Sequence, residues 1–309
     1  MKGVNINDLW YKPVRRPDPG GSPALSILAP VLLVFLWSTG FVGAKWGLPY
    51  AEPFTLSALR YAIAAAVFLA LAFVAGAPWP RGWRQIRDIS LVGILLHGVC
   101  LTGVFWAIAN GTPAWMAALI AGLNPLLTAV LAGPYLGERM RPRQWAGFVL
   151  GFAGVGLVVW QGVATGAGPL PGTLALTLAL FALSGGTLYQ KRHGGGADLR
   201  SAQAVQLLAS VLLVGILALV FEAREIAWTG DFILALAWLS LVLSVGMFTL
   251  LFALIRRSAL TRVSSLFFLV PPLVALETHV LFGEVMTGRD VAGMALAALG
   301  VALVSVKAR

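Results

Sequence analysis

Long apolar segments separated by short polar turns recur along almost the whole chain. The hydrocarbon core of a bilayer is about 30 Å thick and takes about 20 apolar residues in one helix. The segments run unbroken, without the alternation over about ten residues that membrane barrel strands show. The pattern therefore predicts an all-α integral membrane protein with ten transmembrane helices, at about residues 26–46, 53–74, 88–109, 113–135, 144–162, 172–191, 201–221, 232–255, 262–282 and 290–307.

The composition makes the lipid bilayer the natural surroundings of this chain. Hydrophobic residues make up 59% of the 309 residues and charged residues only 11%, whereas soluble domains carry about 25% charged residues. The net charge of +10 lies in short clusters between apolar segments, so we expect no nucleic-acid partner. Residues 1–24 are polar and are expected to form a cytoplasmic tail, followed by a first helix that is not cleaved.

Lysine and arginine are distributed unequally between alternate turns. With ten spans, 18 of them lie on the side that holds both termini and 3 lie on the other side, while Arg60 falls within a span. Positively charged turns of membrane proteins tend to stay in the cytoplasm. We therefore expect a multi-pass protein of the bacterial inner membrane with both termini cytoplasmic.

The second half of the chain repeats the first at an offset of 146 residues. Between positions 123 and 158, 15 of 36 residues are identical to those found 146 positions later. The sequence thus predicts two repeats of five helices each, at 25–163 and 172–307. Because five is an odd number, the second repeat enters the membrane from the opposite side. Inverted repeats of this kind are a recurrent plan of secondary transporters, which bind substrate between the two halves.

Short motifs recur in order along both halves. They are Trp37-Ser38-Thr39-Gly40-Phe41 with Lys45, Ala58-Leu59-Arg60, Asn124-Pro125-Leu126, Leu136-Gly137-Glu138-Arg139, Pro271-Pro272 and Leu281-Phe282-Gly283-Glu284. Over essentially the whole chain after about residue 25, this ordered set resembles the EamA-type family of the drug/metabolite transporter superfamily. The resemblance implies an exporter of amino acids, related metabolites or drugs, with a central cavity lined mainly by helices 1, 3, 4, 6, 8 and 9.

Residues that are identical in both repeats are expected to serve the shared scaffold. Small residues on one stripe let helix backbones approach closely, and such stripes occur on helices 5 and 10, at Gly147, Gly151, Gly154, Gly293 and Gly300. Ser38 and its mate Ser184 are also interpreted as packing residues. Lys45 stands at a helix end, where a lysine ordinarily reaches outward to water.

Two further matched pairs allow two interpretations. Glu138 and Glu284 lie at the turns into helices 5 and 10, where a carboxylate accepts from free N–H groups and complements the helix dipole; gating is the alternative. Pro125 and Pro271 lie within the predicted helices 4 and 9. They serve either as hinges, because a proline frees a backbone carbonyl, or as packing residues.

Polar residues that break the symmetry are the better candidates for substrate or proton binding. Glu277 lies within helix 9, where the first repeat has Leu131, and an intramembrane carboxylate is functional by default. We predict that it binds substrate or carries the coupled proton, unless helix 9 ends early and lets it reach water. His97 is a second candidate for proton coupling, with a satisfied buried histidine as the alternative. Arg60, whose mate is Gln206, either meets a substrate carboxylate or reaches outward.

Aromatic and amide side chains complete the predicted substrate site. Indole and phenol rings combine a large apolar body with one hydrogen-bonding group, which suits amphiphilic solutes. The predicted set consists of Trp37, Trp106, Asn110, Asn124 and Tyr189. The alternative is ordinary packing or a position in the interfacial belt.

The sequence as a whole favours a secondary exporter of small metabolites working by alternating access. No metal-binding cluster, nucleophile–base constellation or phosphate-binding loop occurs, so we expect no cofactor and no enzymatic activity. A carrier of lipid-linked intermediates, a membrane enzyme and a non-transporting sensor remain alternatives. The expected partners are a small-molecule substrate and the bilayer, and a homodimer is compatible with the sequence.

Overall fold

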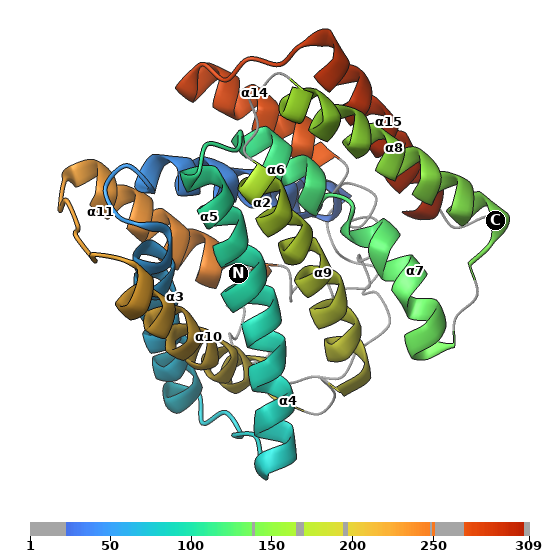
Figure 1. Ribbon diagram of the computed structural model, residues 1–309. Coiled ribbons are helices and arrows are strands. Elements are labelled where there is room, and N and C mark those ends of the chain that lie inside the picture. Colours follow the sequence, from blue (N-terminus) through green and yellow to red (C-terminus); the bar gives the residue numbers. More distant parts are fainter. Residues whose placement is uncertain are drawn as a thin grey trace.

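The computed structural model describes residues 23–137, 140–164, 170–193, 197–247, 249–250 and 269–305. Within these residues the regular structure is helical, apart from a single antiparallel bridge between Ala51 and Ile226. Figure 1 shows the helices in chain order: α2 (Pro23–Gly47), α3 (Pro53–Val74), α4 (Trp83–Gly93), π-helical η1 (Ile94–Leu101), α5 (Thr102–Ala109), α6 (Ala114–Ala121), α7 (Asn124–Leu136), α8 (Pro142–Ala164), α9 (Leu170–His193), α10 (Leu199–Phe221), α11 (Gly230–Ala237), π-helical η2 (Trp238–Met247), α14 (Val270–Phe282) and α15 (Gly288–Ser305).

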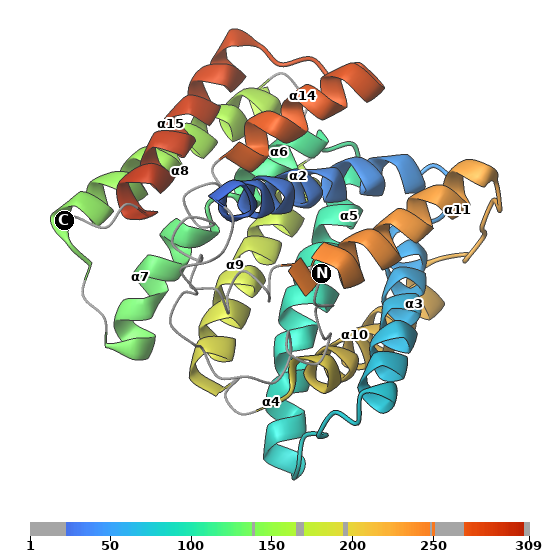
Figure 2. The same ribbon diagram turned by 180° about the vertical axis from the view of Figure 1, so that it is seen from behind.

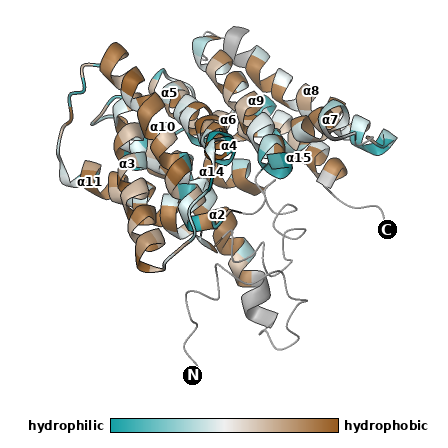
Figure 3. Cartoon of the chain, turned by 90° about the horizontal axis from the view of Figure 1, so that it is seen from below, coloured by the Kyte–Doolittle hydropathy of each residue, from teal (hydrophilic) through white to brown (hydrophobic). Residues whose placement is uncertain are grey.

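Eight helical stretches in the described part are long and apolar enough to cross a membrane. They match the first eight predicted spans, and α14 is a shorter apolar helix of 13 residues. Large apolar side chains lie exposed on their outer faces, such as Val74, Trp160 and Leu212, which are 89%, 75% and 68% exposed. Figure 3 shows hydrophobic colour along the helices and hydrophilic colour mainly near their ends. The structure therefore confirms the prediction of an all-helical membrane protein, whereas the count of ten spans stays a prediction.

The duplication seen in the sequence is also present in the helices. The bounds of α7 and α14 differ by 146 residues at both ends. Each of these two helices stops at a glycine in the left-handed region, Gly137 with φ 74° and Gly283 with φ 67°, because a residue with a side chain rarely adopts that conformation. The π-helical segments η1 and η2 likewise occupy equivalent places in the two halves.

The two matched prolines each lie in the first turn of a helix. In the structure α6 ends at Ala121 and α7 begins at Asn124, so that Pro125 lies in the first turn of α7. Pro271 lies in the first turn of α14. Pro125 therefore lies within the fourth predicted span, just after the break between α6 and α7, where its missing N–H has no helical partner to lose. Its role as hinge or packing residue stays a prediction, and residues 262–268 of the ninth predicted span lie outside the described residues.

Helices of the two repeats are interleaved rather than separated into two bodies. The helix pairs with the most extensive packing take one member from each half: α8 with α15, α3 with α10, α2 with α14, and α9 with α7 and η1. Figures 1 and 2 show α8 lying along α15 from both sides. A movement of one repeat against the other therefore changes contacts throughout the molecule.

The predicted glycine stripes lie between α8 and α15. A Cβ placed on Gly147 would come within 2.6 Å of the Gly300 carbonyl oxygen, and one on Gly154 within 2.5 Å of the Gly293 carbonyl oxygen. Real Cβ atoms do not approach backbone so closely, so the two helices meet at this distance only through glycine. The prediction of close backbone packing between these helices is confirmed.

Candidate functional site

Glu277 is a half-buried residue that contacts a helix of the other repeat. It lies on α14, and its Oε1 is 2.8 Å from the hydroxyl oxygen of Ser38 on α2. Ser38 is fully buried, and its hydroxyl is also 2.7 Å from the carbonyl oxygen of Phe35. The Oε2 atom of Glu277 is buried and has no hydrogen-bond partner among the described residues. Helix α14 continues to Phe282, so Glu277 does not lie at an early helix end.

The hydrogen-bond geometry around Ser38 bears on the protonation of Glu277. A hydroxyl group has one proton to donate, yet two oxygen acceptors stand within hydrogen-bonding distance of it. When the carboxyl is ionised, the Ser38 hydroxyl shares its one proton between Glu277 and Phe35. When the carboxyl carries a proton and donates it to Ser38, each contact has a proton of its own. The arrangement thus fits a neutral carboxylic acid.

The mate of Ser38 makes the corresponding contact in the other half. The Ser184 hydroxyl on α9 donates to Asn124 Oδ1 on α7 at 2.9 Å, and Thr128 donates to the same oxygen at 3.0 Å. The interpretation of the two serines as packing residues was therefore incomplete, because each also forms a polar bond between the repeats. The partner is a neutral amide in one place and a carboxyl group in the other.

A buried polar cluster lies where α3 and α10 meet the two π-helical segments. Arg60 is 4% exposed, and its Nε donates to Ser244 on η2 at 3.0 Å. His97 on η1 is 3% exposed and interacts with the Gln206 side chain, while its carbonyl oxygen accepts from Tyr61 at 2.9 Å. The alternative that Arg60 reaches outward is wrong, because its guanidinium is enclosed by helices.

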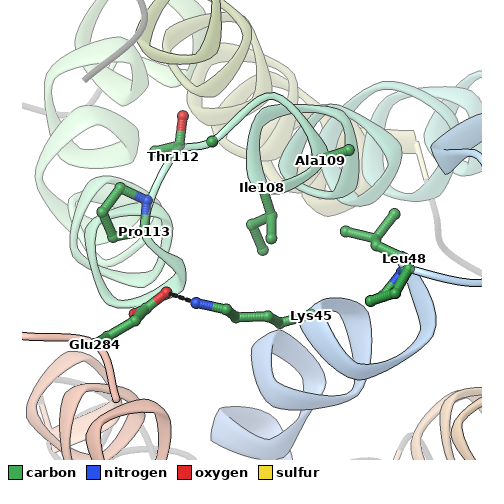
Figure 4. Close-up of a pocket in the computed structure, with 9 residues that line it drawn as sticks. Lys45, Leu48, Ile108, Ala109, Thr112, Pro113 and Glu284 are labelled. Carbon is green, nitrogen blue, oxygen red and sulfur yellow. Dashed lines mark hydrogen bonds and ion pairs between the residues drawn. The ribbon is translucent and has the colours of Figure 1, made fainter. Parts of the chain in front are cut away.

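A cavity of about 530 Å³ lies at the end of α2. Its lining comes from the C-terminal end of α2 and the following turn, from the turn between α5 and α6, and from Glu284. Figure 4 shows Lys45 and Glu284 pointing toward one another across it, where they form an ion pair. Glu284 also accepts from the Ala114 N–H at the start of α6, at 3.1 Å. The cavity is of the size that binds small molecules.

The structure gives each of these charged residues a partner that the sequence did not indicate. Lys45 is partly exposed, and it pairs with a carboxylate from the other repeat. Glu284 lies beyond the end of α14 and binds the first turn of α6, not the helix that follows it. A carboxylate at a helix start is favourable here as predicted, but the helix is a different one. Glu138, the mate of Glu284, lies outside the described residues.

The predicted aromatic and amide residues are distributed over several places. Trp37 on α2 and Trp106 on α5 are each partly exposed, and Trp37 packs against the main core. Asn110 follows α5 directly, lies exposed, and its side chain donates to the Trp106 carbonyl oxygen at 2.8 Å. Tyr189 on α9 donates to Asp88 on α4 at 2.9 Å. Their assignment to a substrate site stays a prediction.

Sequence reasoning missed the partners that bind these side chains. Ser38 with Glu277, and Lys45 with Glu284, are each 239 positions apart. The equal offset follows from a shared geometry, since both pairs join α2 to the α14 region. The only feature of the sequence that pointed to these residues was that Ser38, Lys45 and Glu284 belong to the motifs repeated in both halves.

Apolar helices with duplicated, interleaved halves, polar bonds between those halves and a cavity at their junction define a multi-pass membrane transporter. The model of the EamA-like transporter family matches residues 24–160 and again residues 170–306. The chain belongs to this family, with one copy of the family unit in each half, and it is a transporter rather than an enzyme.

Curated relatives and a solved structure agree with this membership. The chain is 29% identical to the uncharacterized transporter YvbV of Bacillus subtilis, over 90% of each chain. It is 28% identical to a probable amino-acid metabolite efflux pump of Salmonella typhimurium, over 87% of this chain and 91% of the relative. A probable terminal-alkyne amino-acid exporter of Streptantibioticus cattleyicolor is also 28% identical, over 91% and 93%. A crystal structure with 23% identity superposes with a TM-score of 0.63 and covers 90% of this chain and 96% of its own, which shows the fold.

Proposed function

We propose that this transporter exports small metabolites, amino acids or related amphiphilic solutes, across the bacterial inner membrane by alternating access. The observation that carries the proposal is that polar and charged contacts at the cavity and in the interior join one repeat to the other. Movement between repeats breaks and forms such contacts, which is what alternating access requires. Relatives named as amino-acid metabolite efflux pumps support this substrate class.

The proposed topology has ten membrane helices with both termini in the cytoplasm. Helices α6 and α7 together form one span, 114–135, across a short break. Helix α14 is the mate of α7 and belongs to the ninth predicted span, 262–282, of which positions 262–268 lie outside the described residues. Helix α15 lies along α8 and is proposed as the tenth. The unequal distribution of lysine and arginine supports the orientation.

The ion pair between Lys45 and Glu284 is proposed to hold the two repeats together at the periplasmic end. It links the end of α2 to the α14–α15 turn, and Glu284 adds a hydrogen bond to the start of α6. Three segments that line one cavity are thereby connected through a single carboxylate. Opening this end would break the ion pair, so its free energy contributes to the balance between the two states.

Glu277 is proposed to carry the coupled proton. The Ser38 geometry fits the neutral acid, and release of the proton would leave two acceptors competing for one hydroxyl. Deprotonation of Glu277 would therefore weaken its hydrogen bond with Ser38, which joins the two repeats. Proton release would in this way favour the movement of one repeat against the other. Trp37, Trp106 and Asn124 are proposed to line the substrate path, whereas His97 is enclosed by α3 and α10 and is the weaker proton candidate.

Transport by purified protein in proteoliposomes tests this function. The wild type is expected to move at least one of a panel of amino acids and to do so faster with an inward proton gradient. Glu277→Gln imitates the neutral acid, because its amide can donate to Ser38. Gradient-driven export should be lost while exchange at equal pH on both sides persists; loss of exchange as well would assign Glu277 to substrate binding.

A matched control exists in the other half. Asn124→Asp places a carboxyl group against the mate serine, Ser184, and should not create proton coupling in the Glu277→Gln background. Full gradient-driven export by Glu277→Gln would exclude Glu277 from both roles and leave facilitated diffusion. Absence of any transport by the wild type across the panel would contradict the proposed substrate class.

A further inference from the structure

Arg60 is a permanently charged side chain enclosed by helices of both repeats. It stands on α3, its Nε donates to Ser244 on η2 at 3.0 Å, and its guanidinium carbon lies 5.5 Å and 5.9 Å from the ring centroids of Phe105 and Tyr61. Ser244 in turn donates to the Leu239 carbonyl oxygen at 3.0 Å. Two aromatic rings, one hydroxyl group and the nearby His97 thus surround a group that stays protonated at any physiological pH.

No carboxylate neutralises this charge in the described part of the chain. Nine of the twelve acidic residues are described, and none of them forms an ion pair with Arg60. The remaining three are Asp8, Asp18 and Glu138, so the undescribed segment 251–268 contains no acidic residue at all. No described residue accepts a hydrogen bond from the two terminal nitrogens of Arg60. A buried charge is costly unless an anion or a set of acceptors compensates it.

Comparison of Arg60 with the equivalent residue of the other repeat shows that the contact made at this position does not require a charge. The mate of Arg60 is Gln206 on α10, which interacts with His97 on η1. In each half, therefore, the same position on the second helix binds a side chain of the other half's π-helical segment. The neutral amide of Gln206 is sufficient for that contact in one half. The contact therefore does not explain why Arg60 carries a positive charge in the other half.

We propose that Arg60 binds a carboxylate group of the transported substrate. Guanidinium matches a carboxylate with two parallel hydrogen bonds, and the terminal nitrogens of Arg60 are available for them. The side chain is held between α3, α5 and η2, and both α5 and η2 pack on α2, the helix of Ser38 and Trp37. Segments of π-helix are frequent at functional sites, and Ser244 belongs to one. The inference rests on the proposed function and narrows its substrates to organic carboxylates.

Binding and counterflow of acids and their amides test this inference. The probes are leucine and phenylalanine against leucinamide and phenylalaninamide, which keep the ammonium group and side chain but lack the carboxylate. Binding is followed by ligand-induced thermal stabilisation of the purified full chain, and counterflow in proteoliposomes. A charge-assisted hydrogen-bond pair implies a preference of roughly 10- to 100-fold for the acid.

Three variants separate recognition from scaffold. Arg60→Gln copies the residue of the other repeat and should fold, yet lose the preference for acid over amide. Arg60→Lys should keep part of it, because a cation remains. Gln206→Ala, the matched change in the other half, should keep the wild-type preference. A merely structural role of Arg60 would lower transport of acid and amide alike and leave their ratio unchanged.

The outcomes that overturn the inference are distinct from those that contradict the proposed function. Equal binding of acid and amide by the wild type overturns it without any variant, which covers the case in which Arg60→Gln fails to fold. An unchanged preference in a folded Arg60→Gln variant overturns it as well. Wild-type binding of acids without transport would contradict the exporter function while supporting the carboxylate site.

Discussion

Adding one methyl group between α8 and α15 is expected to destabilise the fold measurably. In Gly147→Ala the new Cβ would lie 2.6 Å from the Gly300 carbonyl oxygen and 3.0 Å from side-chain atoms of Leu303 and Val304. Comfortable contacts of carbon atoms are at about 3.5–4.0 Å. The helices must therefore separate by about 1 Å at the crossing, since backbone cannot rotate away as a side chain does.

The expected loss follows from two physical terms. Overpacking of a closely packed contact costs typically about 1–3 kcal/mol. In a membrane the helices are held together chiefly by van der Waals contact rather than by a hydrophobic driving force, so separation forfeits the main attraction. The reciprocal variant, Gly300→Ala, would place Cβ 2.5 Å from the Gly147 carbonyl oxygen and is expected to cost a similar amount.

The same helix supplies the control. Gly156 on α8 has no atom within 4 Å of an added Cβ, so Gly156→Ala changes helix propensity by the same amount as Gly147→Ala without a steric clash. Unfolding of the detergent-solubilised variants by heat or denaturant, followed by circular dichroism, gives the comparison. Gly147→Ala should unfold at clearly lower temperature than Gly156→Ala. Equal stability of the two would refute the close backbone contact between the helices.

The other predictions concern transport. Lys45→Glu and Glu284→Lys should each lower export, and the double exchange should restore part of it because it re-forms the ion pair. No recovery in the double variant would argue against the proposal that this ion pair holds the two repeats together. Ser38→Ala removes the hydroxyl group that is hydrogen-bonded to Glu277 and should weaken coupling to the proton gradient in counterflow assays, and an unchanged pH dependence of export would contradict that role. Trp37→Ala and Trp106→Ala should lower export without loss of membrane insertion, measured by yield in the membrane fraction, and normal export by both would place these rings in packing. Reporter fusions after residues 165 and 309 should lie in the periplasm and the cytoplasm, and two fusions on the same side would refute the odd-numbered repeat.

The spans, the duplication and the glycine contact could be predicted from the sequence because each depends on local or periodic information. Span length follows from the thickness of the bilayer, and the first eight predicted spans appear as apolar helices. The 146-residue offset fixes which helices are mates, as α7 and α14 show. A stripe of glycines identifies a face that another backbone can approach. The family followed from the ordered motifs in both halves.

The candidate site was predicted only in part, because its chemistry depends on partners. Glu277 was singled out as an expensive charge in an apolar helix, but nothing local indicated that it contacts Ser38. The sequence left open whether Arg60 is buried, since a long side chain near a helix end can also reach water. It gave no indication of the partner of Lys45, which pairs with Glu284.

The sequence by itself determined the eight apolar segments that the structure shows as candidate spans and the duplication of the family unit in the two halves. Only the tertiary structure decided which side chains meet, because the repeats interleave and the neighbours of a helix come from the other half. Contacts across 239 positions, such as those of Ser38 and Lys45, depend on how two helices are rotated about their axes and where they cross. Those quantities are set by the packing of the whole bundle, not by any segment of it.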